Sequence, residues 1–401
     1  MFRIRHGARA LYTCTNTSRH HGTTNWQARI KPGDKVYVGM SGGVDSSVTA
    51  YLLKSQNYDV EAIFMRNWDT RDERGECPST RDYHDVQRVC AQLDIKCHQI
   101  DLVKQYWNQV FSTCLDVFAA GQTPNPDILC NSQIKFGVLL DEIDRRLHTS
   151  GAWFVTGHYA RTTACETHPE QVRLLRGVDR RKDQSYYLSG VSGRRLSRAV
   201  FPLGSLIKSQ HVRQIARDAR LVTAEKEESM GICFVGERRR FDKFLAEYLP
   251  QREGDVVASN GRVIGRHHGL FTKTIGQAAS IPGVSGMNGK WYIYAKDPVK
   301  NCMYAALGRE NPLLFSNDIT AGPMHWIAGT APEFGPDNRL ELDAQVRYMQ
   351  LPQPCVVDHI SVRFRDAQFG VASGQYLTLY QGDVCLGSAP IGSTTDTARN
   401  R

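Results

Sequence analysis

The sequence lacks several patterns that would place it in common classes of protein. No apolar run approaches the roughly eighteen residues of a membrane-spanning helix, so we expect no membrane association. The 11 cysteines include no C-x-x-C pair, which argues against a zinc ribbon, and most should be buried and reduced. Neither the G-x-x-x-x-G-K-[ST] loop nor the G-x-G-x-x-G fingerprint occurs. The 401 residues, 41% of them hydrophobic, are enough for two or three domains.

Acidic residues are absent before Asp34. The preceding segment has a formal charge of +6 and many serine and threonine residues. An N-terminus that is rich in arginine and hydroxyls and free of acids is typical of a mitochondrial transit peptide. The alternative is a basic arm that contacts RNA. We expect residues 1–33 to be a transit peptide and the mature protein to lie in the mitochondrial matrix.

Charge is unevenly distributed along the rest of the chain. Its formal value is −6 over residues 34–170, +10 over 171–273 and −1 over 274–401. The basic residues of the middle segment form three clusters, which are Arg176, Arg180, Arg181 and Lys182; Arg194, Arg195 and Arg198; and Arg238, Arg239, Arg240 and Lys243. One such cluster is commonly a solvated face. Three in one segment predict a surface for a polyanion such as RNA.

The stretch G-M-S-G-G-V-D-S at residues 39–46 follows an apolar run and precedes a helical pattern. A glycine turn between a strand and a helix lets backbone N–H groups converge on an anion. The loop contains no lysine, Ser41 and Ser46 offer hydroxyl donors, and a carboxylate such as Asp45 suits a phosphate site mainly if Mg²⁺ lies between them. An ordinary capped glycine turn is the alternative. The position after the first strand of an α/β pattern favours a nucleotide.

Strand-like and helix-like segments alternate from residue 35 to about residue 156. The expected strands are 59–65, 96–101 and 152–156, and the expected helices are 80–93, 104–120 and 132–148. This alternation predicts an α/β fold with a doubly wound, Rossmann-like parallel sheet. We therefore expect a catalytic domain over residues 34–240.

The pattern changes from about residue 250 to glycine-rich turns between short strands. A hairpin is expected over residues 291–307, within a small central domain at 241–311. The later strands are expected at 318–327, 339–348, 355–365, 376–381 and 384–391. They predict a C-terminal β-barrel domain over residues 312–401.

Two cysteines have unusual surroundings. Cys130 lies in T-P-N-P-D-I-L-C-N, a proline-punctuated loop just ahead of an expected helix, where a helix N-terminus would favour the thiolate. Cys233 lies in S-M-G-I-C-F-V-G, an apolar stretch bounded by glycines. Both are candidates for reactive thiols, and burial as structural cysteines is the alternative for each.

The S-G-G-V-D-S string resembles the loop of the PP-loop ATP pyrophosphatases, which cleave ATP between the α and β phosphates and adenylylate an acceptor. A longer series resembles the tRNA-specific 2-thiouridylase family, in the family's order and from Lys35 to about Leu386. It comprises G-M-S-G-G-V-D-S-S, F-M-R-N-W-D, T-P-N-P-D-I-L-C-N-S-Q-I-K-F-G, T-G-H-Y-A-R, L-L-R-G-V-D-R-R-K-D-Q-S-Y-Y-L, F-P-L-G, G-I-C-F-V-G-E and T-I-G-Q. The chain is most similar to mitochondrial members. It departs from the usual bacterial wording at E-E-S-M-G-I-C and at T-I-G-Q-A-A-S.

The resemblance implies ATP-dependent 2-thiolation of the wobble uridine of mitochondrial tRNAs. The uridine C2 oxygen would attack the α-phosphate, releasing pyrophosphate, and sulfur would then displace AMP. Asp45 would hold Mg²⁺. The residues implied to bind ATP are Gly39, Met40, Ser41, Gly42, Gly43, Val44, Asp45, Ser46, Met65 and Gly157.

The resemblance also implies a role for each thiol. Cys233 would carry the sulfur as a persulfide, supplied by a cysteine desulfurase or a relay protein. Cys130 would either attack the terminal sulfur to free sulfide or close a disulfide with Cys233 after transfer. Alternatively, Asp127, Cys130 and Cys233 could hold an iron–sulfur cluster, which we do not expect.

The tRNA would be bound through its anticodon stem-loop, with the target base splayed out of the stack. The residues implied to meet the base are Asn125, Pro126 and Asp127. Those implied to contact the rest of the tRNA are His158, Lys182, Asp183, Gln184, Arg347, Tyr348 and Gln375.

Two other functions are compatible with parts of the sequence. Other PP-loop adenylating enzymes, such as GMP synthetase, argininosuccinate synthetase and tRNA-lysidine synthetase, share the loop but have no use for Cys130 and Cys233 in these contexts. A catalytically silent tRNA-binding protein would tolerate the loss of Ser41, Asp45 or either cysteine. All four residues are present.

Overall fold

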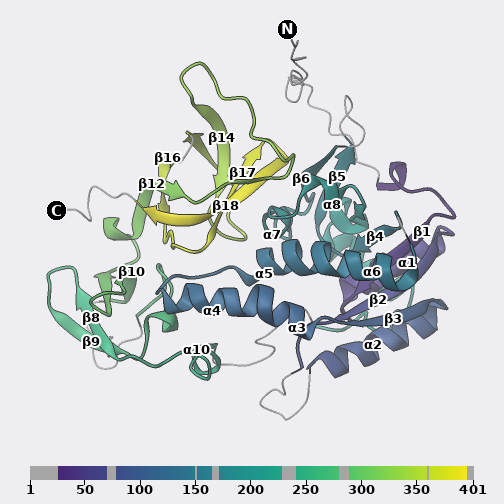
Figure 1. Cartoon of the computed structure of the whole chain (residues 1–401), viewed down its shortest axis with the longest axis horizontal. Helices are drawn as coiled ribbons and strands as arrows, with labels where there is room; N and C mark the ends of the chain where they lie inside the picture. The colour runs from purple at the N-terminus through teal and green to yellow at the C-terminus, as the bar shows by residue number, and fades with distance from the viewer. Residues whose placement is uncertain are drawn as a thin grey trace, which may run out of the picture.

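The computed structural model describes residues 26–69, 78–149, 151–164, 171–227, 241–279, 289–358 and 361–394. Cys233, the basic run at 238–240 and most of the expected transit peptide lie outside these residues. Figure 1 shows the α/β domain at one end of the molecule, the central domain at the other, and the C-terminal barrel packed along one side.

A five-stranded parallel sheet forms the catalytic domain and confirms the expected fold. Its strand order is β3-β2-β1-β4-β7. The strands are β1 (Lys35–Met40), β2 (Asp59–Arg66), β3 (Lys96–Asp101), β4 (Trp153–Thr156) and β7 (Ala199–Val200). Side chains of a strand alternate between the two faces of its sheet, so Val36 and Val38 pack on one face and Tyr37 on the other. The sheet is therefore covered on both sides.

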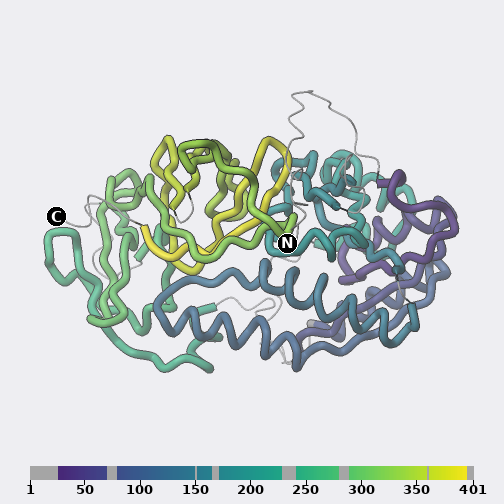
Figure 2. The backbone as a smooth tube through the Cα atoms, turned by 45° about the horizontal axis from the view of Figure 1, so that its top comes forward, coloured from purple at the N-terminus to yellow at the C-terminus, as the bar shows by residue number. Residues whose placement is uncertain are grey.

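The face with Val36 and Val38 is covered by α1 (Val44–Ser55) and α2 (Pro78–Leu93). The other face is covered by two long helical segments, which Figures 1 and 2 show side by side and reaching towards the central domain. One comprises α3 (Val103–Tyr106), the π-helix η2 (Trp107–Phe111) and α4 (Ser112–Ala119); the other comprises α5 (Pro126–Leu129), the π-helix η3 (Cys130–Val138) and α6 (Leu139–Leu147).

The second of these segments begins earlier than the sequence pattern predicts. The side-chain oxygen of Asn125 accepts a hydrogen bond from the backbone N–H of Ile128 at 3.2 Å, and Pro126 occupies the first helical position. An asparagine cap followed by proline is a favourable helix start. Cys130 therefore lies one turn inside a helical segment and not in a loop ahead of it.

Shorter elements complete the catalytic domain. They are α7 (Ser185–Leu188), α8 (Gly193–Leu196), η4 (Pro202–Ser205), the π-helix η5 (Lys208–Val212) and α9 (Arg213–Asp218). The hairpin of β5 (Ala160–Ala164) and β6 (Val172–Arg176) leaves the domain and joins the sheet of the barrel, where β6 pairs with β18. The catalytic domain and the barrel thus share backbone hydrogen bonds.

The central domain contains a four-stranded sheet in the order β10-β11-β8-β9. Its elements are α10 (Phe241–Leu245), β8 (Gly254–Ala258), β9 (Val263–His267), η6 (Leu270–Thr272), β10 (Trp291–Asp297) and β11 (Cys302–Leu307). The antiparallel pairing of β10 with β11 confirms the expected hairpin at 291–307.

The C-terminal domain is a closed barrel, as expected. Neighbouring strands follow the order β12-β16-β15-β14-β17-β18, and β18 pairs back to β12. The elements are η7 (Pro312–Leu314), β12 (Phe315–Ala321), β13 (His325–Trp326), β14 (Leu340–Gln345), β15 (Gln353–Val357), β16 (Ser361–Phe369), β17 (Tyr376–Gln381) and β18 (Val384–Thr394). The expected strand at 355–365 is wrong, because it comprises parts of β15 and β16, which run antiparallel. Among the described residues, no helix is long and apolar enough to cross a bilayer.

Residues 26–33 pack into the catalytic domain. Ile30 is fully buried, and Trp26, in η1 (Trp26–Ala28), packs against the same core cluster. The guanidinium of Arg29 donates to the carbonyl of Ala199 at 2.6 Å and to that of Ser197 at 2.7 Å, and burial lowers the pKa of Arg29 to about 10. The folded domain therefore includes Trp26, Arg29 and Ile30, which lie within the expected transit peptide.

Candidate nucleotide and thiol site

The phosphate loop, residues 39–46, joins the carboxyl end of β1 to α1 and is braced by its own hydroxyls. Ser46 Oγ accepts from the Ser41 backbone N–H at 3.2 Å and donates to the Gly43 carbonyl at 3.1 Å. Ser47 Oγ donates to the same carbonyl at 2.8 Å. These contacts shape the turn, so backbone N–H groups at the start of α1 remain as the natural donors to an anion.

Two glycines of the predicted ATP site are required by close backbone contacts. Gly42 has φ +75°, and a Cβ there would lie 2.6 Å from the carbonyl oxygen of Asp82 in α2. A Cβ at Gly157 would lie 2.9 Å from the backbone carbon of Asp45. Gly157 directly follows β4, which pairs with β1. It therefore contacts the phosphate loop, although it lies 112 positions after Asp45 in the chain.

Asp45 has two partners that the sequence pattern did not reveal. Its Oδ2 lies 2.9 Å from the Nζ of Lys208, and its Oδ1 accepts a hydrogen bond from the Tyr159 hydroxyl at 2.8 Å. A lysine-free loop was expected, and the loop itself has none. The neighbouring cation comes from η5, 163 positions later. In the sequence, Tyr159 lies within the T-G-H-Y-A-R stretch and Lys208 follows the F-P-L-G stretch by four positions. These two family stretches were the only sequence signals near the two residues.

The remaining nucleotide residues share one edge of the sheet. Met40 ends β1, and Met65 lies near the end of the parallel strand β2. The carboxyl ends of parallel strands form the ligand-binding edge of such folds. The structure therefore gathers residues 39–46, Met65 and Gly157 at one edge.

The ligands that the protein supplies around Asp45 suit a magnesium ion only if a bound substrate adds further oxygen ligands. Mg²⁺ commonly takes one or two protein carboxylates and completes its shell with phosphate oxygens and water. Asp45 supplies one carboxylate, and each of its oxygens keeps a lone pair beyond those used by Tyr159 and Lys208. In the described part of the chain, no group of three or more His, Cys, Asp or Glu side chains could hold a metal ion.

Asn125 and Pro126 belong to a second stretch, residues 123–126, which ends at the first position of α5 and which we call the base loop. Gln375 of the barrel spans it: its amide nitrogen donates to the Pro124 carbonyl at 2.9 Å, and its oxygen accepts from Asn125 Nδ2 at 3.3 Å. The Thr123 N–H donates to the Ser373 carbonyl at 2.9 Å. The base loop is thus held between the catalytic domain and the barrel.

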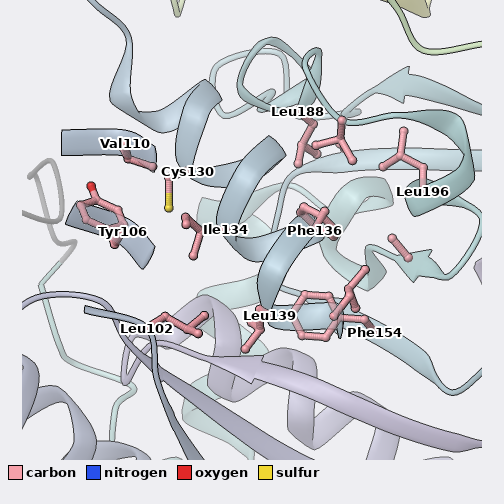
Figure 3. Packing of buried hydrophobic residues seen from close by; sticks show 14 of the residues in the cluster. Leu102, Tyr106, Val110, Cys130, Ile134, Phe136, Leu139, Phe154, Leu188 and Leu196 are labelled. Carbon is pink, nitrogen blue, oxygen red and sulfur yellow. The ribbon is translucent and has the colours of Figure 1, made fainter. Parts of the chain in front are cut away.

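Asp127 and Cys130 follow this loop in the capped helix. Burial of its carboxyl raises the pKa of Asp127, and nearby Lys135 partly opposes that shift. Cys130 is 4% exposed. Figure 3 shows its sulfur among Tyr106, Val110 and Ile134, all of which belong to the same core cluster. A thiol in such surroundings must be reached through a neighbouring opening or by local movement.

The same helical segment connects Cys130 with the nucleotide edge. Two turns further on, the Phe136 ring lies 5.6 Å from that of Phe154 in β4 and 6.0 Å from that of His158. His158 directly follows Gly157, which touches the phosphate loop. One continuous helical stretch, residues 126–136, therefore joins the base loop to the nucleotide edge, and the chain kinks just beyond it at Gly137.

Models of known families match nearly the whole chain. The tRNA methyl transferase HUP domain matches residues 34–237, the tRNA methyl transferase PRC-barrel domain residues 242–306, and the aminomethyltransferase beta-barrel domain residues 316–391. The tRNA-specific 2-thiouridylase MnmA of Marinobacter nauticus is 42% identical over 381 residues, covering 93% of this chain and 94% of that protein.

The chain belongs to the tRNA-specific 2-thiouridylase family. The MnmA proteins of Bacillus velezensis and Bacillus subtilis are 44% and 43% identical over 367 residues, each covering 90% of this chain and 96% of the relative. These relatives are bacterial. They therefore support the family assignment without bearing on a mitochondrial location.

Residues 182–184 (K-D-Q), which the family resemblance implies to contact tRNA, have mostly inward-facing side chains. The carboxylate of Asp183 accepts from Arg176 Nε at 2.9 Å and from two backbone N–H groups, and Gln184 Oε1 accepts from the Tyr159 N–H at 3.0 Å. Both residues thus shape the loop 177–184. Lys182 is the cation of the three and is only partly buried, so it is the best placed for RNA.

His158, which the family resemblance implies to contact tRNA, is largely buried. It is 8% exposed, its ring lies between Phe136 and Phe201, and its Nδ1 is 2.6 Å from Thr156 Oγ1. Burial, with a smaller effect of Lys135, holds the pKa of His158 well below its usual value. Its side chain therefore packs between two aromatic rings, and its contact with tRNA stays a prediction.

Arg347 and Tyr348 lie in the turn between β14 and β15, beside the catalytic domain. The Tyr348 ring stacks on that of Tyr187 with centroids 4.3 Å apart. Arg347 donates to the Phe369 carbonyl at 2.8 Å. Met349 and Leu351 of the same turn are 69% and 60% exposed, so the turn presents an apolar and aromatic surface next to the catalytic domain.

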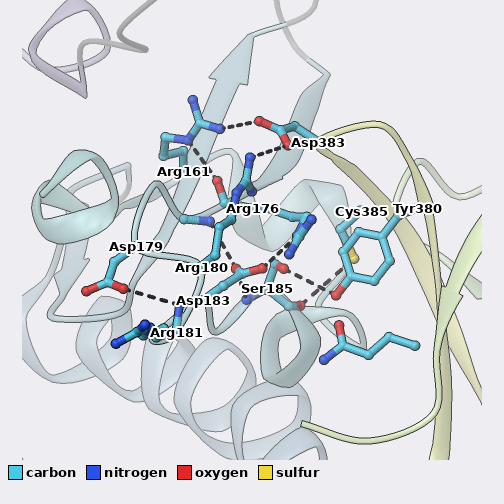
Figure 4. A network of polar contacts seen from close by, with 12 residues as sticks. Arg161, Arg176, Asp179, Arg180, Arg181, Asp183, Ser185, Tyr380, Asp383 and Cys385 are labelled. Carbon is cyan, nitrogen blue, oxygen red and sulfur yellow. Dashed lines mark hydrogen bonds and ion pairs between the residues drawn. The ribbon is translucent and has the colours of Figure 1, made fainter. Parts of the chain in front are cut away.

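Some arginines of two basic clusters form ion pairs within the protein. Arg180 and Arg161 both contact Asp383 of the barrel, at 2.6 and 2.8 Å, as Figure 4 shows, so a positive charge remains there. Arg195 and Arg198 make two-bond ion pairs with Asp141 and Asp144 of α6, respectively. These pairs reduce the charge that the clusters offer to a polyanion, and the predicted polyanion surface stays a prediction.

A groove of 1230 Å³ lies between the base loop and the central domain. Thr123, Pro124, Pro126 and Gln375 line one side of it. Its lining includes Lys243, Arg266 and Lys273, two histidines, and the acidic side chains of Asp242 and Glu247. The structure thus places a groove with more basic than acidic side chains directly beside the residues predicted to meet the target base.

Proposed function

We propose that the protein 2-thiolates the wobble uridine of tRNA in an ATP-dependent reaction. The observation that carries the proposal is the helical stretch from Pro126 to Phe136, which begins at the base loop, bears Cys130, and packs through Phe136 against β4, the strand next to β1. This stretch connects a nucleotide site, a candidate nucleophile and a groove for a polyanion. The family assignment supports the same reaction.

In the first half-reaction, the uridine C2 oxygen attacks the α-phosphorus of ATP and pyrophosphate leaves. The backbone N–H groups at the start of α1 bind the phosphates, and Asp45 would hold Mg²⁺, which supplies charge neutralisation when bound. Asp127 lies at the start of the helix that bears Cys130, next to the residues predicted to meet the base, and burial raises its pKa.

In the second half-reaction, a sulfur atom forms a bond to C2 and AMP leaves with the original oxygen. We propose that this sulfur arrives as a persulfide on Cys233, which lies outside the described residues, from a cysteine desulfurase or relay protein. Cys130 resolves the persulfide in one of two ways. It attacks the Cys233 sulfur of the persulfide before transfer, so that the S–S bond breaks and hydrosulfide leaves to attack C2, or it attacks the same sulfur once the terminal sulfur is bonded to C2. Both routes leave a Cys130–Cys233 disulfide that an external thiol must reduce.

The groove between the base loop and the central domain would receive the anticodon stem-loop. Its basic side chains neutralise phosphates, and the base loop lies at its edge to meet an extruded base. Lys182 and the exposed turn at 346–351 would extend this surface across the catalytic domain and the barrel.

We further propose that the protein acts in the mitochondrial matrix. The support is the acid-free, arginine-rich N-terminus, and the packing of Trp26 and Arg29 restricts any cleavage to positions before Trp26. Residues 1–25 fused to a fluorescent reporter should direct it to mitochondria, and N-terminal sequencing of the imported protein should find Trp26 retained. A mature N-terminus beyond Ile30 would contradict this boundary.

Mass spectrometry of mitochondrial tRNA nucleosides from cells with and without the protein tests the function. Loss of 2-thiouridine derivatives on deletion, and their return with the wild-type gene, is the expected result. In the purified reaction, AMP and pyrophosphate should accumulate with tRNA present. ADP and inorganic phosphate as products would contradict the adenylylation chemistry, and unchanged thiouridine would favour a silent tRNA-binding protein.

A further inference from the structure

The Asp45 carboxylate is held from two sides by residues outside the phosphate loop. Lys208 Nζ lies 2.9 Å from Oδ2, and the Tyr159 hydroxyl donates to Oδ1 at 2.8 Å. Lys208 is 8% exposed and Tyr159 2% exposed. The lysine ammonium also lies 5.8 Å from the centroid of the Tyr159 ring, within the range of a cation–π contact. The two buried side chains therefore form one contacting group with the partly exposed Asp45 carboxylate beside the loop.

The two supporting residues are each tied to the loop 177–184. Asp179 of that loop accepts the backbone N–H of Lys208 at 3.0 Å with one oxygen and the N–H of Arg181 at 3.2 Å with the other. Gln184 accepts the backbone N–H of Tyr159 at 3.0 Å. Two short routes thus run from Asp45 to the loop that carries Lys182, one through Lys208 and Asp179 and the other through Tyr159 and Gln184.

Electrostatics explains why a lysine stands here. Asp45 lies in the first turn of α1, where the N-terminus of the helix favours an anion, and the incoming triphosphate is itself an anion. A lone carboxylate would repel it. Lys208 offsets the carboxylate charge in a setting with little solvent screening, since only a tenth of its side chain is exposed.

We infer that Lys208 and Tyr159 are positioning residues for Asp45 in ATP binding, and that Asp179 ties Lys208 to the loop predicted to contact tRNA. Lys208 neutralises Asp45 and fixes one of its oxygens, while Tyr159 fixes the other. The inference rests on the proposed function only in taking residues 39–46 as the ATP site. It adds three residues that the motif of the phosphate loop does not contain.

Isothermal titration calorimetry with ATP and Mg²⁺, in the absence of RNA, tests the roles of the two contacts. Lys208→Met should weaken ATP binding about tenfold, Lys208→Arg should stay within about threefold of wild type, and Tyr159→Phe should weaken binding about threefold. Lys35→Met is the matched control. Lys35 also forms ion pairs, with Asp59 and Glu61, but at the opposite end of β1, and its loss should leave ATP affinity unchanged.

A double-mutant cycle with Asp45→Asn separates positioning from direct phosphate contact. If Lys208 acts through the carboxylate, Lys208→Met should cost less than about twofold in the Asp45→Asn background. An equal tenfold loss in both backgrounds would overturn the assignment and make Lys208 a direct phosphate ligand. Unchanged affinity in the single Lys208→Met variant would overturn it as well.

Asp179→Ala tests the link to the loop 177–184. It removes the acceptor of the Lys208 N–H without touching Asp45, and it should weaken ATP binding about threefold. Wild-type affinity in this variant would contradict the link. If wild-type protein binds ATP as described but forms no thiouridine, the proposed function fails and this inference stands; if wild-type protein binds no ATP, both fail.

Discussion

The phosphate loop and the base loop differ in where their supports come from. The hydroxyls of Ser46 and Ser47 bond within the phosphate loop itself, three and four residues away, and its remaining described partners belong to the catalytic domain. The base loop is held by Gln375, 250 positions from Asn125, and by the Ser373 carbonyl, both in the barrel. The nucleotide site therefore needs one folded domain, whereas the base site needs two domains to be docked.

The largest expected effect distinguishes adenylylation at the phosphate loop from sulfur transfer at Cys130, which follows the base loop. Cys130→Ser should lower thiolation by about a thousandfold or more, because an alcohol is a poor substitute for a thiolate nucleophile, while tRNA-dependent release of pyrophosphate from the first half-reaction is retained. Thiouridine and pyrophosphate should be measured in the same reaction. Cys114→Ser is the matched control, since Cys114 is a buried thiol of the same core cluster and should keep thiolation within about threefold.

Full thiolation by the Cys130→Ser protein would refute a role for this thiol. Equal loss of pyrophosphate release and thiolation would show that adenylylation and sulfur transfer do not depend on separate groups.

Gly42→Ala should break the phosphate loop and leave the base loop intact. The left-handed backbone and the 2.6 Å approach of the Asp82 carbonyl together should cost about 3 kcal/mol, or about a hundredfold in ATP affinity. Calorimetry with ATP and binding of an anticodon stem-loop RNA measure the two sites separately. RNA affinity should change less than about twofold.

Gly151→Ala controls for backbone strain alone. Gly151 has φ +96°, but a Cβ at this position would meet no atom within 4 Å, so its substitution should leave ATP affinity unchanged. An equal loss in both variants would assign the effect to general destabilisation and not to the loop.

Gln375→Ala should show the opposite pattern. It removes the side chain that spans the base loop, so kcat/KM for tRNA should fall about tenfold while the KM for ATP changes less than about twofold. Gln381→Ala, at the exposed end of β17, should have no effect. A rise in the KM for ATP would mean that the barrel also supports the nucleotide site.

The smallest expected effect concerns His158, which lies between the two loops. The pKa of His158 is lowered in the folded protein. At pH values below about 6.5, the pKa of the unfolded chain, the imidazole is therefore protonated in the unfolded chain but stays neutral in the folded one. Stability should therefore fall by up to about 1.4 kcal/mol per pH unit as pH drops from 6.5 towards 5. Denaturant unfolding at several pH values should show a shallower slope for His158→Asn. An identical slope would mean that the imidazole titrates freely.

Local sequence was enough to predict the elements that depend on short-range patterns. The parallel sheet follows from the alternation of apolar strands with helical segments, and the strands at 96–101 and 376–381 have the predicted bounds. The phosphate loop was recognisable because a strand, a glycine turn and a helix start are contiguous in the chain. The predicted element bounds were wrong where helix capping or strand pairing determines them. Examples are the helix that starts at Pro126 and residues 355–365, which are divided between β15 and β16.

The sequence by itself thus determined the fold class, the phosphate loop and the chemical candidates Asp45 and Cys130. Only the tertiary structure decided which charges meet. It brought Lys208 to Asp45, paired Arg195 and Arg198 with acids of α6, and packed Arg29 into the domain from a segment with the composition of a leader. The reason is physical: helix and strand periodicities act over a few residues, whereas the energy of an ion pair depends on separation in space and on solvent exposure, which the order of residues does not encode directly.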